Sequence, residues 1–138
     1  MIGLTVARKP GLAYSLRYIA EASPIGPATN IAMQEFSRAN AVMLGGGYFN
    51  PLTGYMNKAD ALSVAKDMKT TSGLFWPTPV LNLVEDAHNI KAGDRIALKD
   101  PNVEGHPVLA VMDVEAVEEF TDDEMALITE NVYRPNKD

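Results

Sequence analysis

The sequence contains no cysteine, so it offers neither a disulfide framework nor thiolate ligands for a metal ion. Redox chemistry through side-chain thiols is thereby excluded, and the composition fits a reducing compartment. No apolar run is long enough to cross a bilayer, and the N-terminus lacks the continuous apolar core of a signal peptide. Together these absences predict a cytoplasmic protein that is not anchored in a membrane.

Basic residues are also scarce. Twelve lysines and arginines stand against eighteen acidic residues, which gives a formal net charge of −6. The segment Asp113–Glu130 alone holds eight acidic residues and no basic one. Because phosphate backbones are negatively charged, this balance argues against a general affinity for nucleic acids.

What is present is typical of one folded domain. The chain has 138 residues, of which 46% are hydrophobic and 22% are charged. This length suffices for one hydrophobic core and is too short for two substantial ones. No internal repeat or low-complexity tract interrupts it.

Three helices are predicted from cap signals. Residues 31–44 follow a loop rich in proline and glycine, and Thr29 or Asn30 is expected to cap a helix that stops at Gly45.

A second helix is predicted from Asn57 to about Lys69. The Asn57 side chain can accept from unpaired N–H groups of the first turn, and Asp60 favours the positive end of the helix. The T-x-x-E pattern of Thr121 and Glu124 is a capping box, which predicts a third helix directly after it.

The predicted strands lie mostly between the last two helices. Arg95–Leu98 and Val108–Val117 are expected to pair antiparallel across the turn DPNVEG. Pro77 and Pro79 cannot donate to a sheet, so another strand is expected to begin near Val80. The opening residues hold a short strand or remain an arm. Helices before and after a small sheet predict an α+β fold with a bent or barrel-like, mostly antiparallel sheet.

The stretch MLGGGYFNPLTGYMN, Met43–Asn57, shares only its glycines with phosphate-binding loops. A Walker loop continues into Lys and a hydroxyl residue, and the dinucleotide fingerprint needs a third glycine and a preceding strand. Neither pattern is present, so the glycines are expected to end the preceding helix in a left-handed conformation. Four side chains are expected to fold back as apolar plugs: Tyr48, Phe49, Leu52 and Tyr55.

The two histidines and the five serines carry no pattern of a catalytic or metal site. His88 and His106 fall in predicted turns without a second ligand at metal spacing. No serine stands in the G-x-S-x-G context of an activated nucleophile. The serines are Ser15, Ser23, Ser37, Ser63 and Ser72.

The other candidates for chemistry have structural explanations. Asp122, Asp123 and Glu124 are a conceivable cation site, but carboxylates in a first helical turn already meet the helix dipole. Trp76 is expected to anchor the core rather than to stack on a ligand. The residues therefore predict no catalytic group, no cofactor-binding group, no metal ligand and no cofactor.

The glycine stretch resembles a segment of the ATP sulfurylases, also called sulfate adenylyltransferases. The family pattern G-x-F-x-P-L-x-G-F-M-N is matched here by Gly47, Phe49, Pro51, Leu52, Gly54, Tyr55, Met56 and Asn57. Tyr55 replaces the usual Phe. LFWPTPVLNL, DRIALKDPNVEGHPVLAVMDVEAVEEF and TDDEMALITENVYR are similar to three further family segments in the same order. The resemblance covers Asn40–Tyr133, about two-thirds of the chain.

This resemblance implies that residues 35–138 form the PUA-like N-terminal domain of that family, after a loosely matched arm and loop of residues 1–34. In the complete enzyme, ATP and sulfate give adenylyl sulfate and pyrophosphate. The catalytic groups of the family lie in a following nucleotidyltransferase domain, on Q-x-R-N-P and G-R-D-H-A-G segments. Neither segment occurs here, so no active-site residue carries over and the chain alone is expected to be inactive.

Two functions follow as hypotheses. In the first, the domain packs against the catalytic domain, in cis or in trans, and supports its shape and assembly. An isolated domain would then expose the apolar surface that meets its partner, and self-association through that surface is expected. In the second, the chain is a free-standing PUA-like module that binds RNA, which the acidic balance disfavours.

Overall fold

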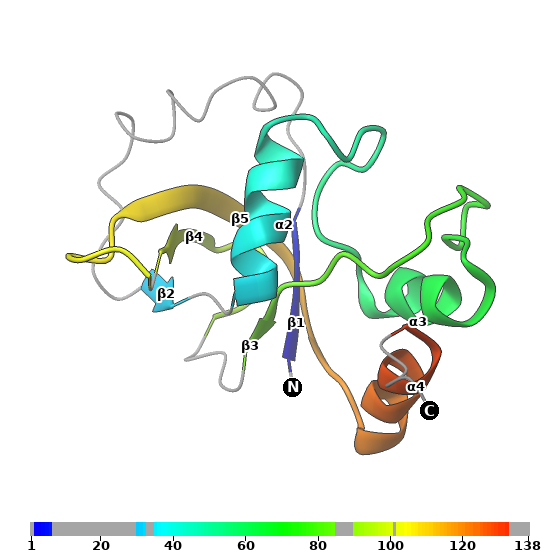
Figure 1. Cartoon of the computed structure of the whole chain (residues 1–138). Coiled ribbons are helices and arrows are strands. Elements are labelled where there is room, and N and C mark those ends of the chain that lie inside the picture. The colour runs from blue at the N-terminus through cyan, green and yellow to red at the C-terminus, as the bar shows by residue number, and fades with distance from the viewer. Residues whose placement is uncertain (1, 7–29, 33–34, 85–89, 101, 133–138) are drawn as a thin grey trace, which may run out of the picture.

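The computed structural model describes residues 2–6, 30–32, 35–84, 90–100 and 102–132 (Figure 1). Four residues named above, Ser15, Ser23, Thr29 and His88, lie outside the described residues, as does most of the predicted arm and loop. The described elements are three helices and one five-stranded sheet, which confirms the α+β class.

The five strands form one mostly antiparallel sheet in the order β2-β4-β5-β1-β3. Their bounds are Ile2–Val6 (β1), Asn30–Ala32 (β2), Leu83–Val84 (β3), Arg95–Lys99 (β4) and Val108–Glu119 (β5). Only the pair β2–β4 is parallel among the described strands. The sequence predicts a bent or barrel-like sheet. The described strands do not close into a barrel.

Strand β5 joins the two halves of the sheet. Its residues Val108–Asp113 pair with β4, and Val114–Glu119 pair with β1 on the other side. The predicted hairpin is confirmed, and each strand runs slightly further than expected. Arg95 lies opposite Asp113 and donates to both carboxylate oxygens, at 2.7 and 3.2 Å. Such a two-pronged pair across a ladder fixes the register of β4 on β5.

The first predicted helix begins later than expected. Residues Asn30–Ala32 form β2, which pairs with Ala97–Lys99, and the helix α2 spans Glu35–Gly45. The predicted helix cap at Asn30 is therefore wrong, because Asn30 lies in a strand. The β-branched Ile31 suits a strand, and pairing with a distant segment overrides a local helical signal. The predicted stop at Gly45 is confirmed.

The other two helices begin where the cap signals place them. Asn57 accepts from the Asp60 N–H at 2.8 Å, and α3 spans Lys58–Asp67. Thr121 and Glu124 exchange two hydrogen bonds, of 2.9 and 3.2 Å, at the start of α4, Asp122–Val132. In the described part of the chain, no helix is long and apolar enough to cross a membrane.

Helices α3 and α4 pack side by side next to the sheet (Figure 1). Lys58 connects them to β5. The Lys58 N–H donates to Glu118 at 2.8 Å, and its Nζ donates to the Glu119 carbonyl at 3.0 Å. The same Nζ lies 3.0 Å from a Glu124 carboxylate oxygen. One residue thus joins β5 and the N-termini of both helices.

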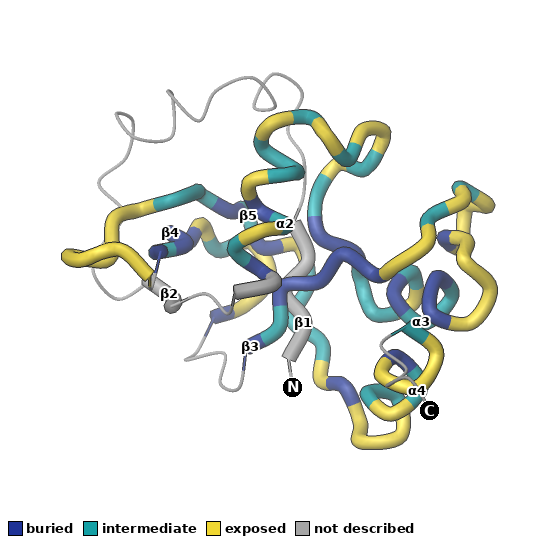
Figure 2. Tube along the Cα trace, in the orientation of Figure 1, coloured by how far each residue is buried: buried dark blue, intermediate teal, exposed yellow. Residues whose placement is uncertain are grey.

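The strand expected near Val80 is shorter than predicted. Only Leu83 and Val84 pair as β3, on the edge beside β1. Val80 instead accepts a hydrogen bond from the Met56 N–H at 2.8 Å. Figure 2 shows the neighbouring residues 79–82 as a buried segment between the sheet and the helix pair.

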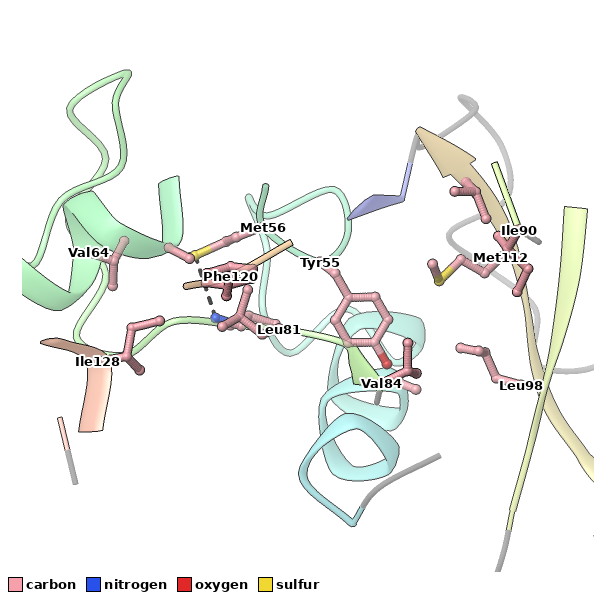
Figure 3. Close-up of a cluster of buried hydrophobic side chains, with 14 of the residues drawn as sticks. Tyr55, Met56, Val64, Leu81, Val84, Ile90, Leu98, Met112, Phe120 and Ile128 are labelled. Carbon is pink, nitrogen blue, oxygen red and sulfur yellow. Dashed lines mark hydrogen bonds between the residues drawn. The ribbon is translucent and has the colours of Figure 1, made fainter. Parts of the chain in front are cut away.

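One apolar core links the sheet to the helix pair. Figure 3 shows its side chains from Val64 and Ile128 at the α3–α4 end to Leu98 and Met112 beside β4 and β5, with Tyr55 between them. The six largest fully buried side chains are Ile96, Leu98, Met112, Val64, Val80 and Asn82.

Asn82 is the polar exception in that core. Its Nδ2 donates to the Met112 sulfur at 3.6 Å, while its buried Oδ1 has no hydrogen-bond partner among the described residues. A buried amide oxygen without a partner costs free energy, which the surrounding apolar packing must offset.

Candidate interaction surface

The loop that follows α2 folds back on the end of that helix. The N–H groups of Gly46, Gly47 and Tyr48 donate to carbonyls of Val42, Leu44 and Met43, respectively, at 2.9 to 3.2 Å. Gly47 has φ +78°, which confirms the predicted left-handed end of the helix. These N–H groups are engaged within the protein, so they do not form a cradle for a phosphate.

Gly46 is required by a close approach. A Cβ placed there would lie 2.8 Å from two ring atoms of Tyr48 and 3.2 Å from the Val42 carbonyl oxygen. The Tyr48 ring therefore lies over the backbone of Gly46, and any larger residue at this position would displace it.

Three of the four predicted apolar plugs contact the core, and one does not. Tyr55 is buried, and Phe49 and Leu52 pack partly buried against the core. The prediction for Tyr48 is wrong, since 74% of its surface is exposed. The reason is local: with Phe49 and Tyr55 already directed inward, the ring of Tyr48 lies outward over Gly46.

Tyr55 anchors this loop to α2. Its hydroxyl donates to the Ser37 carbonyl oxygen at 2.6 Å, and burial raises the pKa of the phenol. A phenylalanine at this position could not make this hydrogen bond, so the hydroxyl of Tyr55 adds a polar contact inside the core.

A second loop lies beside the first. After α3 the backbone turns at Thr70–Gly73, and Lys69 and Phe75 form an isolated antiparallel bridge. Trp76 is half-buried, and its ring meets the Phe49 ring edge-on with centroids 5.5 Å apart. The predicted anchoring role of Trp76 is thus confirmed, and it joins the two loops.

Both loops lack charge. No charged residue occurs between Arg38 and Lys58, nor between Lys69 and Glu85, although charged residues make up 22% of the sequence. Three large side chains stand exposed on or beside these loops: Tyr48 (74%), Phe75 (63%) and Met68 (53%). We call these three residues, with the exposed uncharged residues of 46–53 and 70–78, the uncharged surface.

Those residues considered for catalysis or metal binding that the structure describes are not brought together into one site. His106 is exposed in the β4–β5 turn with φ +46°, Ser37 is buried, and Ser72 lies in the exposed turn after α3. Within the described ranges, no three acidic or histidine side chains are grouped so that they could hold a metal ion.

The three carboxylates at the start of α4 lie in its first turn, as predicted. Glu124 accepts from the Thr121 N–H and pairs with Lys58, and these contacts lower the pKa of its carboxyl. Asp122 and Asp123 are exposed.

One partly buried ion pair was not indicated by the sequence. Arg38 Nε on α2 lies 2.8 Å from Oδ2 of Asp100, a buried residue that follows β4. Oδ1 of Asp100 accepts from the Asn102 N–H at 2.9 Å. The Arg38 hydrogen bond first, and then the Asn102 N–H, lower the pKa of Asp100 below its ordinary value of 3.8. No short-range motif links residues 62 positions apart, so only the fold reveals the pair.

The Asp100→Asn variant is expected to lose less stability on acidification than the parent protein. Because the folded pKa of Asp100 is lowered, its contribution is present above the unfolded pKa and is lost as pH falls through the folded pKa. Urea midpoints of both proteins should therefore differ at pH 7 and converge below about pH 4. Glu104→Gln, which removes one carboxylate from the exposed turn nearby, is the control. A difference that stays constant between pH 7 and pH 3 would contradict this linkage.

The chain is similar to a known domain family and to known enzymes. The sequence model of the PUA-like domain family matches residues 18–138. The sulfate adenylyltransferase of Alcanivorax borkumensis is 56% identical over 104 residues, covering 75% of this chain and 26% of that protein. The sulfate adenylyltransferase of Allochromatium vinosum is 58% identical over 104 residues, with the same two coverages.

A more distant relative is also matched over about a quarter of its length. The sulfate adenylyltransferase of Desulfovibrio desulfuricans is 39% identical over 106 residues, covering 75% of this chain and 24% of that protein. The chain thus spans about a quarter of the length of the curated relatives that it matches. A solved structure, described as a hexameric APS kinase from Thiobacillus denitrificans, aligns with a TM-score of 0.47 at 24% identity, over 67% of this chain and 22% of that one. A likeness at that level does not bear on function.

Proposed function

The chain belongs to the PUA-like domain family, and from this premise we propose that it serves as the non-catalytic N-terminal domain of a sulfate adenylyltransferase. One observation carries the proposal: identity above 50% to two such enzymes is confined to about a quarter of their length. Identity at that level over 104 residues supports the same domain role, whereas short motifs alone would not.

In this proposal, the transfer of an adenylyl group from ATP to sulfate takes place in the part of the enzyme outside the chain. The domain supports the shape and assembly of that part. The engaged N–H groups of the glycine loop favour this division, because the most phosphate-like loop of the sequence serves to close α2. Binding to RNA is not proposed, since the net charge is −6 and eight acidic residues without a basic one lie in the segment Asp113–Glu130, on β5 and α4.

Two finer points belong to the same proposal. We assign residues 35–138 to the PUA-like domain and treat residues 1–34 as the segment that precedes it, from which Ile2–Val6 and Asn30–Ala32 add β1 and β2 to the sheet. The family match extends into this segment, since it begins at residue 18. A cytoplasmic location is proposed with it, in keeping with the absence of cysteine and with an enzyme that uses ATP.

The test is a chimaera with the Alcanivorax borkumensis relative. Its matched quarter is replaced by the full 138-residue chain, and sulfate-dependent release of pyrophosphate from ATP is measured. We expect activity within about ten-fold of the parent enzyme, since 56% identity keeps most of the domain surface. The chain alone should release none, and the relative without its matched quarter should be inactive or insoluble. An inactive, well-folded chimaera would overturn the proposed function.

A further inference from the structure

We propose that the uncharged surface, centred on Tyr48 and Phe75, is the face by which this domain docks onto the catalytic part of the same enzyme. The inference rests on the proposed function and adds to it the identity of the docking face. The occupant is a complementary apolar, uncharged patch on the part of the polypeptide that follows this domain.

The apolar character of this face is the first support. Six large hydrophobic side chains are exposed among the described residues, and three of them lie on or beside the two loops: Tyr48, Met68 and Phe75. Tyr48 and Phe75 each adjoin, in the sequence, one member of the Phe49–Trp76 ring pair that joins the loops. Aromatic residues and methionine are the types enriched at the centres of protein interfaces.

The lack of charged residues within the two loops is the second support, although Asp60 and Lys69 border the second loop. Interface centres are depleted of charged residues, because each charge would have to give up its water without a partner. The uncharged segments 39–57 and 70–84 meet beneath this face, through the Phe49–Trp76 ring contact and, deeper in the core, the Met56–Val80 hydrogen bond. The opposite case is the region of β5 and α4, where acidic residues gather and an apolar partner would be disfavoured.

The rigidity of both loops is the third support. The first loop is held by hydrogen bonds to the end of α2 and by Tyr55, and the second by the Lys69–Phe75 bridge and the Thr71 contacts to the Asp60 carboxylate. A face that is already ordered loses little conformational freedom on binding, so more of its contact energy appears as affinity.

The relatives indicate what covers this face. About three-quarters of their length lies outside the matched region, and under the proposed function this remainder is what the domain packs against. Interfaces between domains of one polypeptide are of moderate size, which a surface built on two short loops can supply. A second copy of the domain on the same face is the competing occupant, and the experiment distinguishes the two.

The experiment compares three forms of the chimaera described above. The first is unchanged, the second carries Tyr48→Ser and Phe75→Ser, and the third carries Val103→Ser and Val108→Ser as the control. The control residues are also exposed, at 45% and 43%, but they flank the turn between β4 and β5, far from the two loops (Figure 1). Limited proteolysis at the domain junction, sulfate-dependent activity and oligomeric state are measured for each.

We expect the Tyr48/Phe75 form to be cleaved at the junction about ten-fold faster than the unchanged form, and the control within about two-fold of it. The same pair of changes in the isolated domain should leave its melting temperature unchanged, because both side chains are largely exposed there. An inactive unchanged chimaera would defeat the proposed function itself. An active chimaera in which both pairs of changes behave alike would overturn the docking face. Self-association of the isolated domain that Tyr48→Ser and Phe75→Ser abolish, with the chimaera unaffected, would show that a second copy is the occupant.

Discussion

Replacing Phe120 with alanine is expected to lower the free energy of unfolding by about 4 kcal/mol, as for a large aromatic removed from a packed core. Phe120 is 4% exposed and lies between the end of β5 and the start of α4. Its ring belongs to the α3–α4 end of the core (Figure 3), and the Lys58 ammonium lies 5.9 Å from its centroid. The cavity would therefore open at the junction through which the helix pair is attached to the sheet.

Urea unfolding followed by circular dichroism measures this loss, with Phe120→Leu as the matched variant. Leucine keeps much of the apolar volume and should cost only about 1 to 2 kcal/mol. A loss below about 1 kcal/mol for alanine would mean that α3 and α4 move to close the cavity, contrary to the rigid attachment through Lys58.

Replacing Leu98 with alanine is expected to cost about 3 kcal/mol, the second largest effect. Leu98 lies in the middle of β4 and is 1% exposed, and its neighbours Ile96 and Ala97 are also fully buried. Both faces of β4 are therefore covered, so no solvent-facing side can relax into the space that the leucine leaves.

The midpoint of urea unfolding, at an unchanged dependence on urea, gives the size of the effect. Val103→Ala is the control, since this residue is 45% exposed and should change stability by no more than about 0.5 kcal/mol. Equal losses for the two variants would show that the core does not reach the middle of β4.

The elements that the sequence predicts well are those determined by local contacts. Asn57 and the pair Thr121 and Glu124 cap helices with hydrogen bonds between residues three apart, so the pattern is complete within a few letters. The β4–β5 hairpin is similarly local. By contrast, β2 exists only because Asn30–Ala32 meets β4, some 67 residues later, and no local propensity encodes that pairing.

In the candidate surface, too, some features are predicted from local sequence and others depend on contacts between distant residues. The sequence predicts correctly that the glycines end α2 and that Tyr55 and Trp76 pack in the core. It does not predict that Tyr48 faces outward, because alternation of apolar residues cannot show which ring the fold leaves uncovered. The meeting of two uncharged segments depends on the Phe49–Trp76 contact, which joins residues far apart in the sequence.

The pairing of β1 with β5 also sets the order in which the protein can fold as it is made. β1 leaves the ribosome first, but its partner residues Val114–Glu119 follow only about 110 residues later. Before then, only Leu83 and Val84 of β3 are available to pair with β1, whereas the β4–β5 hairpin can form from neighbouring residues. Completion of the sheet on both sides of β1 therefore awaits synthesis of residues up to Glu119.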